Sequence, residues 1–182
     1  MNLLFRTLYV LLAALRRERL GPLDESTVTF RVLPNDLDVN LHMNNGRYLT
    51  LMDLGRLDLI ARIGILGEIR RRRWMPVIGA QKIRYRRSLK PFQKYQLRSR
   101  LLCWDDKWFF MEQRFEHRGH LMAIALVKGL FLGPEGQVPT QRVVEVAGVE
   151  IASPPFPEPV AAWQEAESVL REYETDDVEA AG

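Results

Sequence analysis

The sequence predicts an α+β fold in which a curved antiparallel sheet wraps around one long helix. The first observation is that residues 47–66 repeat apolar side chains at helical spacing around much of the circumference, which is typical of a helix covered on several sides. The second is that residues 76–132 alternate apolar and polar positions between turn residues, which predicts several antiparallel strands. A helix and a sheet that each bury an apolar face pack as layers around one core.

The flanking elements follow in chain order. Residues 1–20 are expected to form an amphipathic helix, and Ser26–Leu33 a strand ended by Pro34. Gly64 and Gly67 are candidate stops for the long helix.

Turn residues divide the rest of the chain. Turns are expected at Lys90–Pro91, Asp105–Asp106 and Arg118–Gly119, which favours successive hairpins and an antiparallel meander. A short helix at 140–148, a proline-rich connector at 153–159, a helix at 161–174 and a frayed acidic end after Thr175 are expected to follow. The predicted units are therefore an N-terminal helix (1–20), a core domain (21–135) and a C-terminal appendage (136–182).

Composition excludes several classes of protein. The chain has 182 residues with 47% hydrophobic and 27% charged, which suits one folded domain. Its 26 basic and 23 acidic residues leave a net charge of +3, which by itself predicts no polyanion partner. One cysteine, Cys103, permits no internal disulfide, and with three histidines a structural zinc site is not expected. Cys103 lies in a predicted strand and is interpreted as a core thiol. A reducing, cytoplasmic setting fits.

The N-terminal segment differs from a signal peptide, because Arg16, Arg17 and Arg19 follow its apolar run instead of preceding it. Its leucines Leu4, Leu8, Leu11, Leu12 and Leu15 share one helical face. We favour a helix packed on its own protein or on an oligomer partner. The alternative is a helix lying peripherally on a membrane surface, where Tyr9 and the arginines suit the headgroup region.

The segment Asp36–Asn45, "DLDVNLHMNN", gathers two acids, three asparagines and a histidine directly before the long helix. Such residues are common caps and turn formers. A helix N-terminus also presents backbone N–H groups without helical partners and a partial positive charge. The segment can therefore serve local geometry, an anionic group, or both.

The pattern D-x-D-x-N-x-H-x-N-N-x-x-Y is filled by Asp36, Asp38, Asn40, His42, Asn44, Asn45 and Tyr48. Followed by a long helix, it resembles the hotdog-fold acyl-CoA thioesterases, in particular the 4-hydroxybenzoyl-CoA thioesterase-like family and its acyl-ACP thioesterase relatives. The resemblance covers residues 26–132. It implies a hotdog fold, hydrolysis of an acyl-CoA or acyl carrier protein thioester by water, no metal or organic cofactor, and sites shared between paired subunits.

The resemblance also assigns catalytic roles. Asp38 is the expected acid, either as a general base that activates water or as a nucleophile. Gly46 opens the helix, where backbone N–H groups up to Tyr48 are candidate oxyanion donors. His42 would orient Asp38, bind substrate or only bond the loop. Asp53 is a second candidate acid, with an ion pair to Arg56 as the alternative.

Substrate contacts are predicted for Asn40, Asn44, Asn45 and Tyr48. Capping or turn geometry is the alternative for Asn44 and Asn45, and Tyr48 is expected as a packed wall of the site. Asp36 is interpreted as structural. By the resemblance, Arg86, Arg87, Ser88 and Lys90 hold the phosphates of CoA.

The basic runs Ile69–Trp74 and Arg84–Lys90 also suggest nucleic-acid binding. Because acids elsewhere nearly cancel the charge, a solvated loop and an outward strand face are the competing interpretation. We expect no nucleic-acid partner.

Two functional alternatives stay open beside thioesterase activity: a non-catalytic acyl-chain or membrane-associated binding protein on the same scaffold, and a dehydratase with His42 as base. Open sheet edges and the resemblance both predict a homodimer or homotetramer.

Overall fold

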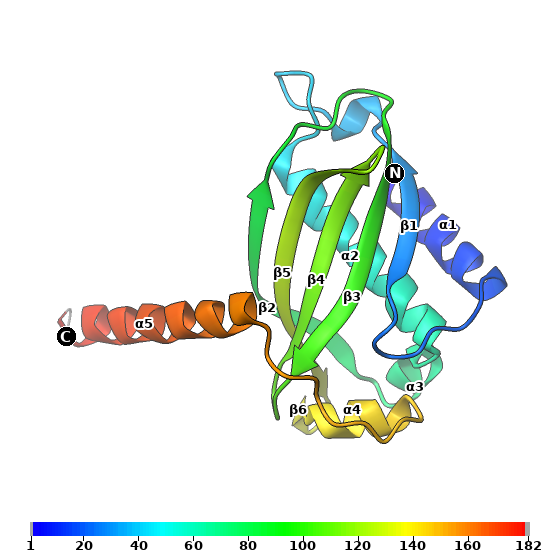
Figure 1. The fold of residues 1–182 in the computed structure, drawn as a ribbon. Coiled ribbons are helices and arrows are strands. Elements are labelled where there is room, and N and C mark those ends of the chain that lie inside the picture. The colour runs from blue at the N-terminus through cyan, green and yellow to red at the C-terminus, as the bar shows by residue number, and fades with distance from the viewer. Residues whose placement is uncertain (1, 181–182) are drawn as a thin grey trace.

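The computed structural model describes residues 2–180 and has one curved antiparallel sheet. Its strands are β1 (Ser26–Arg31), β2 (Met75–Tyr85), β3 (Lys94–Trp104), β4 (Phe109–His117), β5 (His120–Gly133) and the short β6 (Gly136–Val138). The strand order is β1-β3-β4-β5-β2, and β6 pairs with β5 (Figure 1). The predicted α+β class is confirmed.

Only the middle of the sheet is a meander. β3, β4 and β5 follow one another as hairpins, and Arg118 and Gly119 form the second turn with φ of 50° and 76°, as a tight two-residue hairpin requires. The prediction of a hairpin at Lys90–Pro91 is wrong. β2 pairs with β5, so residues 86–93 cross from one edge of the sheet towards β3. Turn residues look alike in a hairpin and in a crossing segment, because they report local geometry and no pairing partner.

The long helix α2 (Asn45–Ile63) lies on the concave face of the sheet (Figure 1). It buries residues around much of its circumference, among them Tyr48, Leu51, Met52, Leu54 and Leu59. Gly64 ends it with φ of 95°, as predicted for a glycine stop. At Gly55 a Cβ atom would lie 2.6 Å from Ser99 Oγ, so the missing side chain lets the helix approach the sheet closely.

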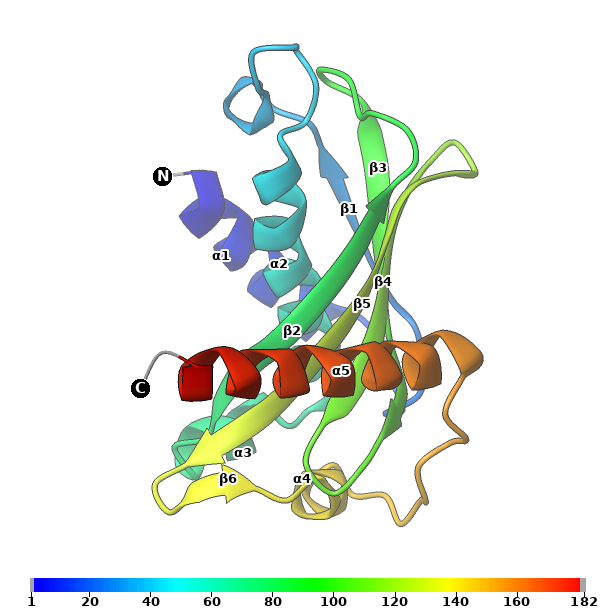
Figure 2. The ribbon, with the colours of Figure 1, turned by 90° about the vertical axis from the view of Figure 1, so that its left-hand side faces the viewer.

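The N-terminal helix α1 (Asn2–Arg16) packs against α2, on the side of α2 away from the sheet (Figure 2). Its packed residues are Arg6, Val10 and Ala14, spaced four apart. The predicted leucine face points outward instead, with Leu4 71% and Leu15 81% exposed. The short side chains of Val10 and Ala14 allow close helix contact, and a buried ion pair of Arg6 with Asp36 fixes which face turns inward.

Three further helices occupy the far end and the back of the sheet. They are α3 (Leu66–Arg71), α4 (Thr140–Val146) and α5 (Glu158–Ala180). The basic run predicted as a loop is thus partly helical, because Glu68 pairs with Arg71 and Arg72 one turn away.

The C-terminal appendage follows the expected order of short helix, connector and final helix. α5 begins on the sheet through Val160 and Trp163 and then projects away from the body (Figure 1). It continues past Glu174, the predicted end, and residues 181 and 182 of the predicted frayed tail lie outside the described residues. None of the helices between residues 2 and 180 combines the length and apolarity needed to cross a bilayer.

Candidate active site

Asp36 is the buried anchor of the polar segment. Its carboxylate accepts hydrogen bonds from Arg6 Nη1 at 3.0 Å and Nη2 at 2.6 Å, and from Arg47 Nη2 at 3.0 Å. Burial would raise the pKa of Asp36, but the hydrogen bonds from Arg6 and the Leu33 amide outweigh it and hold this pKa below its usual value. The backbone carbonyl of Asp36 accepts the Asn44 N–H at 2.8 Å. Asp36 is therefore structural, as predicted.

Asp38 stands two residues later in a different environment. Its backbone N–H donates to the His42 carbonyl at 2.8 Å, and Leu41 has a φ of 56°, so the chain folds back on itself. Carboxylate oxygen Oδ1 accepts the N–H groups of Asn40 at 2.8 Å and His42 at 3.3 Å. Within residues 2–180, Oδ2 accepts no hydrogen bond. The half-buried side chain is thus oriented through one oxygen and free at the other.

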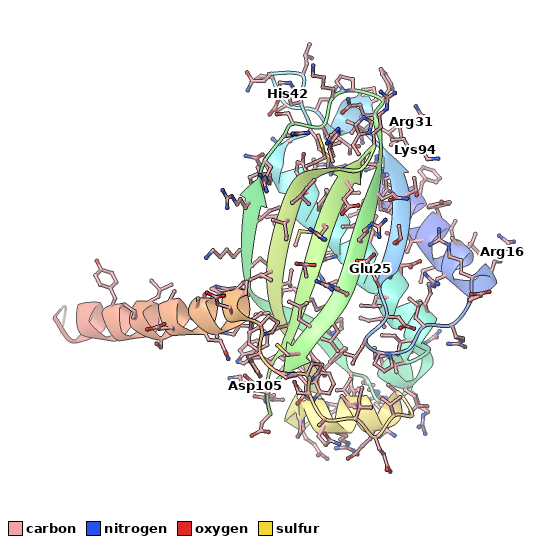
Figure 3. All side chains as sticks on the ribbon, viewed as in Figure 1. Arg16, Glu25, Arg31, His42, Lys94 and Asp105 are labelled. Atoms are coloured by element: carbon pink, nitrogen blue, oxygen red, sulfur yellow. The ribbon has the colours of Figure 1, made fainter. Side chains whose placement is uncertain are left out.

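Asn40 and His42 contribute their backbone to this arrangement. Figure 3 shows His42 at the outer end of the loop. Among the described residues its ring forms no hydrogen bond, so the ring does not orient Asp38 here. The roles of both side chains towards a substrate stay predictions.

The mouth of α2 is capped by Asn44, whose Oδ1 accepts the Gly46 N–H at 2.8 Å. Its carbonyl accepts the Arg47 N–H at 2.9 Å. Asn44 therefore caps α2, and its contact with a substrate stays a prediction.

Tyr48 lies one turn inside the helix and is 2% exposed. Its ring packs edge-on against Tyr85 and Phe115, with centroids 5.2 Å and 4.8 Å away. Burial raises the pKa of Tyr48 to about 12, so the phenol stays neutral. It forms a packed wall, as expected. Next to it, the Tyr85 hydroxyl donates to the Asn45 carbonyl at 3.1 Å.

Asp53 forms an ion pair with Arg56, the second of the two alternatives. The Asp53 side chain is 67% exposed, whereas that of Arg56 is 9% exposed. At about 1.5 Å of rise per residue, Asp53 lies roughly 12 Å along the helix from Asn45. A single chain therefore does not bring Asp53 beside the capped mouth of α2.

A buried glutamine, Gln113 of β4, supports this ion pair and was missed from the sequence. Its Oε1 accepts Arg56 Nη1 at 2.6 Å, and its Nε2 donates to the Met52 carbonyl at 3.0 Å. Nε2 also donates to Ser99 Oγ at 2.8 Å. A polar residue at an inward position of an alternating strand was the available signal, because buried polar groups need partners.

The basic segment Arg86–Lys90 lies beside the polar loop. The N–H groups of Arg86 and Arg87 both donate to the Met122 carbonyl, at 2.8 Å and 3.1 Å. The carbonyl of Leu89 accepts the Met43 N–H at 2.9 Å, which ties the segment to the chain just before α2. The side chains of Arg86, Arg87, Ser88 and Lys90 are exposed. Two parts of the predicted site, far apart in sequence, are therefore adjacent.

An apolar cavity of about 460 Å³ opens further along α2, lined by this helix, the sheet, α4 and the start of α1. Of the described side chains that line it, only Thr7, Asp53 and Arg56 are polar. Nothing in the sequence marked this cavity, because its lining comes from several separate elements.

Comparison with known proteins decides the family. The sequence profile of the thioesterase-like superfamily matches residues 32–164. The chain belongs to this superfamily. It is 35% identical over 144 residues to Protein THEM6 of Xenopus laevis, covering 78% of this chain and 68% of that protein. It is 42% identical over 108 residues to Protein THEM6 of Danio rerio, covering 58% of this chain and 54% of that one.

Solved structures of thioesterases share the fold. YbaW, a probable thioesterase from Escherichia coli, superimposes with a TM-score of 0.62 at 20% identity, covering 66% of this chain and 94% of YbaW. A DHNA-CoA thioesterase from Staphylococcus aureus gives 0.61 at 13% identity, covering 84% of this chain and 95% of the enzyme. The predicted hotdog fold is confirmed, and the predicted class of thioester hydrolase is confirmed at the level of the superfamily.

Proposed function

We propose that this superfamily member hydrolyses acyl-CoA thioesters, with Asp38 as the catalytic acid. The observation that carries the proposal is the free Oδ2 of Asp38, held in a loop that adjoins both the N-terminus of α2 and the basic segment Arg86–Lys90. An anionic base, hydrogen-bond donors and cationic side chains thus meet at one end of the molecule.

Each group matches one need of the reaction. Asp38 takes a proton from water, which adds to the thioester carbonyl, or its carboxylate adds directly and the resulting anhydride is hydrolysed. Donors at the start of α2 stabilise the oxyanion of the tetrahedral intermediate. Its collapse breaks the C–S bond, and the CoA thiolate leaves and takes up a proton. Exposed Arg86, Arg87 and Lys90 bind the CoA phosphates by charge-assisted hydrogen bonds, which favours CoA as the carrier.

The test is thiol release from a panel of acyl-CoA substrates. Wild type should release free thiol, and Asp38→Asn should lower turnover by about 10²-fold or more, the effect of losing a general base. The KM and melting temperature should stay near wild type. Ligand retention without turnover would favour the binding protein, and an enoyl product would favour the dehydratase. Full activity of Asp38→Asn would refute the role of Asp38.

Peripheral membrane contact is a second part of the proposal, supported by the exposed apolar face of α1. Deleting α1 would also remove Arg6 and leave Asp36 short of a partner. We therefore specify Leu8→Gln with Leu15→Gln, which keep the packed face intact. Co-sedimentation with phosphatidylcholine–phosphatidylserine vesicles should fall relative to wild type, while Val169→Gln, an exposed apolar position on α5, should not change it. Equal sedimentation of all three proteins would refute membrane contact by α1.

The predicted oligomer stays part of the proposal. Among the described strands, β2 pairs only with β5 and leaves one edge of the sheet open. Light scattering should give a mass of two or four times 21.1 kDa, and a 21.1 kDa species alone would refute it.

A further inference from the structure

The apolar cavity along α2 suggests which acyl group the enzyme takes. Its floor comes from α4, where Val143 and Val144 are each 4% exposed and pack among Trp104, Phe109 and Phe131. Its rim includes the exposed Asp53 and the paired Arg56. The lining therefore combines one ion pair with an otherwise almost entirely apolar surface that α4 helps to form.

We propose that this cavity binds the acyl chain of the substrate, that the chain is a long aliphatic one, and that α4 sets the length accepted. The proposal rests on the proposed thioesterase function and adds the substrate class. A hydroxylated aromatic acyl group would lose hydrogen bonds with water and could regain them only at Thr7, Asp53 and Arg56, since the other described side chains of the lining are apolar. A hydrocarbon chain loses nothing on entry.

The distance between site and cavity explains why length matters. A carbonyl held at the start of α2 lies roughly 12 Å, or about two helical turns, from the level of Asp53. A short acyl group with its carbonyl there ends before the rim. A longer chain passes along α2 and enters, and each methylene it buries strengthens binding about fourfold.

The floor is built by a segment outside the predicted core domain 21–135. α4 follows β6, and its Thr140 is tied to the β3–β4 turn through hydrogen bonds to the Asp106 and Asp105 carbonyls. Thr140 is 1% exposed, so the helix is fixed to the sheet and can act as a wall of constant position. Replacing an inward residue of α4 by a larger one should shorten the cavity without touching Asp38 or the basic segment.

Val143→Phe makes this change, and Val146→Phe is the matched control. Val146 lies on the same helix and is partly buried, but it does not line the cavity. Ala147→Leu, at a partly exposed lining position, provides a second filling variant should Val143→Phe fold poorly. Circular dichroism and the melting temperature identify the variants that are folded.

Two readouts separate this inference from the proposed function. The first is kcat/KM for saturated acyl-CoA substrates from two to sixteen carbons. Wild type should favour long chains by at least 10²-fold over acetyl-CoA, and the filling variants should move the optimum to shorter chains while Val146→Phe does not. The second is fluorescence binding of 11-(dansylamino)undecanoic acid, competed by palmitate, which needs no hydrolysis and should weaken at least tenfold in the filling variants only.

The outcomes are distinct. If wild type binds the fatty acid, the filling variants do not, and no thioester is hydrolysed, the acyl-chain site stands and the thioesterase proposal is overturned. Hydrolysis with no dependence on chain length, or with the same profile in the filling variants and wild type, would overturn the chain site and keep the thioesterase.

Discussion

Replacing Asp36 by asparagine should destabilise the fold strongly, although the change keeps the shape of the side chain. Asp36 is fully buried and neutralises Arg6, which is itself 7% exposed. An amide cannot neutralise that guanidinium and turns an N–H₂ group towards it. Removing one partner of a buried ion pair costs about 3–5 kcal/mol, because the other charge stays buried.

The lower end of that range is expected for Asp36→Asn. Its other cationic partner, Arg47, has a side chain 26% exposed and can regain water, whereas Arg6 cannot. For a chain of this size about 1 kcal/mol corresponds to about 2–4 °C, so the melting temperature should fall by roughly 6–12 °C for a loss near 3 kcal/mol. Urea unfolding followed by circular dichroism measures the free energy directly.

Asp38→Asn is the matched control. The amide oxygen can still accept the N–H groups of Asn40 and His42, so stability should change by less than about 0.5 kcal/mol. In a double-mutant cycle, Arg6→Gln should cost less in the Asp36→Asn background than alone, because it then removes a buried charge that has no partner, while the charge of Arg47 can reach water. Equal stabilities of Asp36→Asn and wild type, or equal losses in both asparagine variants, would refute the anchoring role of Asp36.

Three further outcomes are expected. The folded-state pKa of Asp36 lies below the unfolded value of about 3.9, so the stabilisation by this carboxylate is complete above that pH and is lost as the pH falls through the folded-state pKa. In urea titrations, the difference in free energy of unfolding between wild type and Asp36→Asn should therefore narrow below about pH 4. A difference that widens there would contradict this expectation. Gly55→Ala should lower the free energy of unfolding by about 1–3 kcal/mol, because the added Cβ would lie 2.6 Å from Ser99 Oγ. Gly67→Ala is the control and should not lower it, because Gly67 has open space around it. Equal effects of the two changes would exclude packing as the cause. Arg86→Ala with Arg87→Ala should raise the KM for an acyl-CoA about tenfold but not that for an N-acetylcysteamine thioester, which has no phosphates; a parallel rise for both would remove the phosphate role.

The periodicity of apolar residues was sufficient to predict the helix and sheet layers of the fold, but not the order in which the strands pair. Apolar spacing at 47–66 and alternation in β3 to β5 report which residues face the core, and those elements form as expected. The position of β2 at the far edge depends on which strand it pairs with, and alternation carries no such information. For α1, the leucine pattern was correct as a helix signal but indicated the wrong inward face. The inward face is set by the ion pair of Arg6 with Asp36, and apolar spacing carries no information about that partner.

The candidate site shows the same limit at the level of single side chains. Asp36 and Asp38 have the same chemistry and lie two positions apart, and the motif alone suggested which one is structural. Burial and partners separate them physically: one is enclosed by two arginines, and the other keeps a free oxygen. Arg47 and Gln113 escaped notice because their roles depend on partners far along the chain or on the inward face of a strand.

The Asn44 cap at the start of α2 would affect how differently the proposed site binds the neutral thioester and the oxyanion intermediate. The Gly46 N–H already has an acceptor in the neutral side chain of Asn44. A neutral thioester carbonyl would replace that bond by one of similar strength and gain little. An oxyanion forms a charge-assisted bond about twice as strong, so only the charged intermediate profits from displacing Asn44. Asn44, as a cap worth about 1 kcal/mol to the helix, would then keep the Gly46 N–H bonded while the substrate is neutral and release it when the oxyanion forms. The site would thus bind the charged intermediate more tightly than the substrate, and this difference in binding accelerates the reaction.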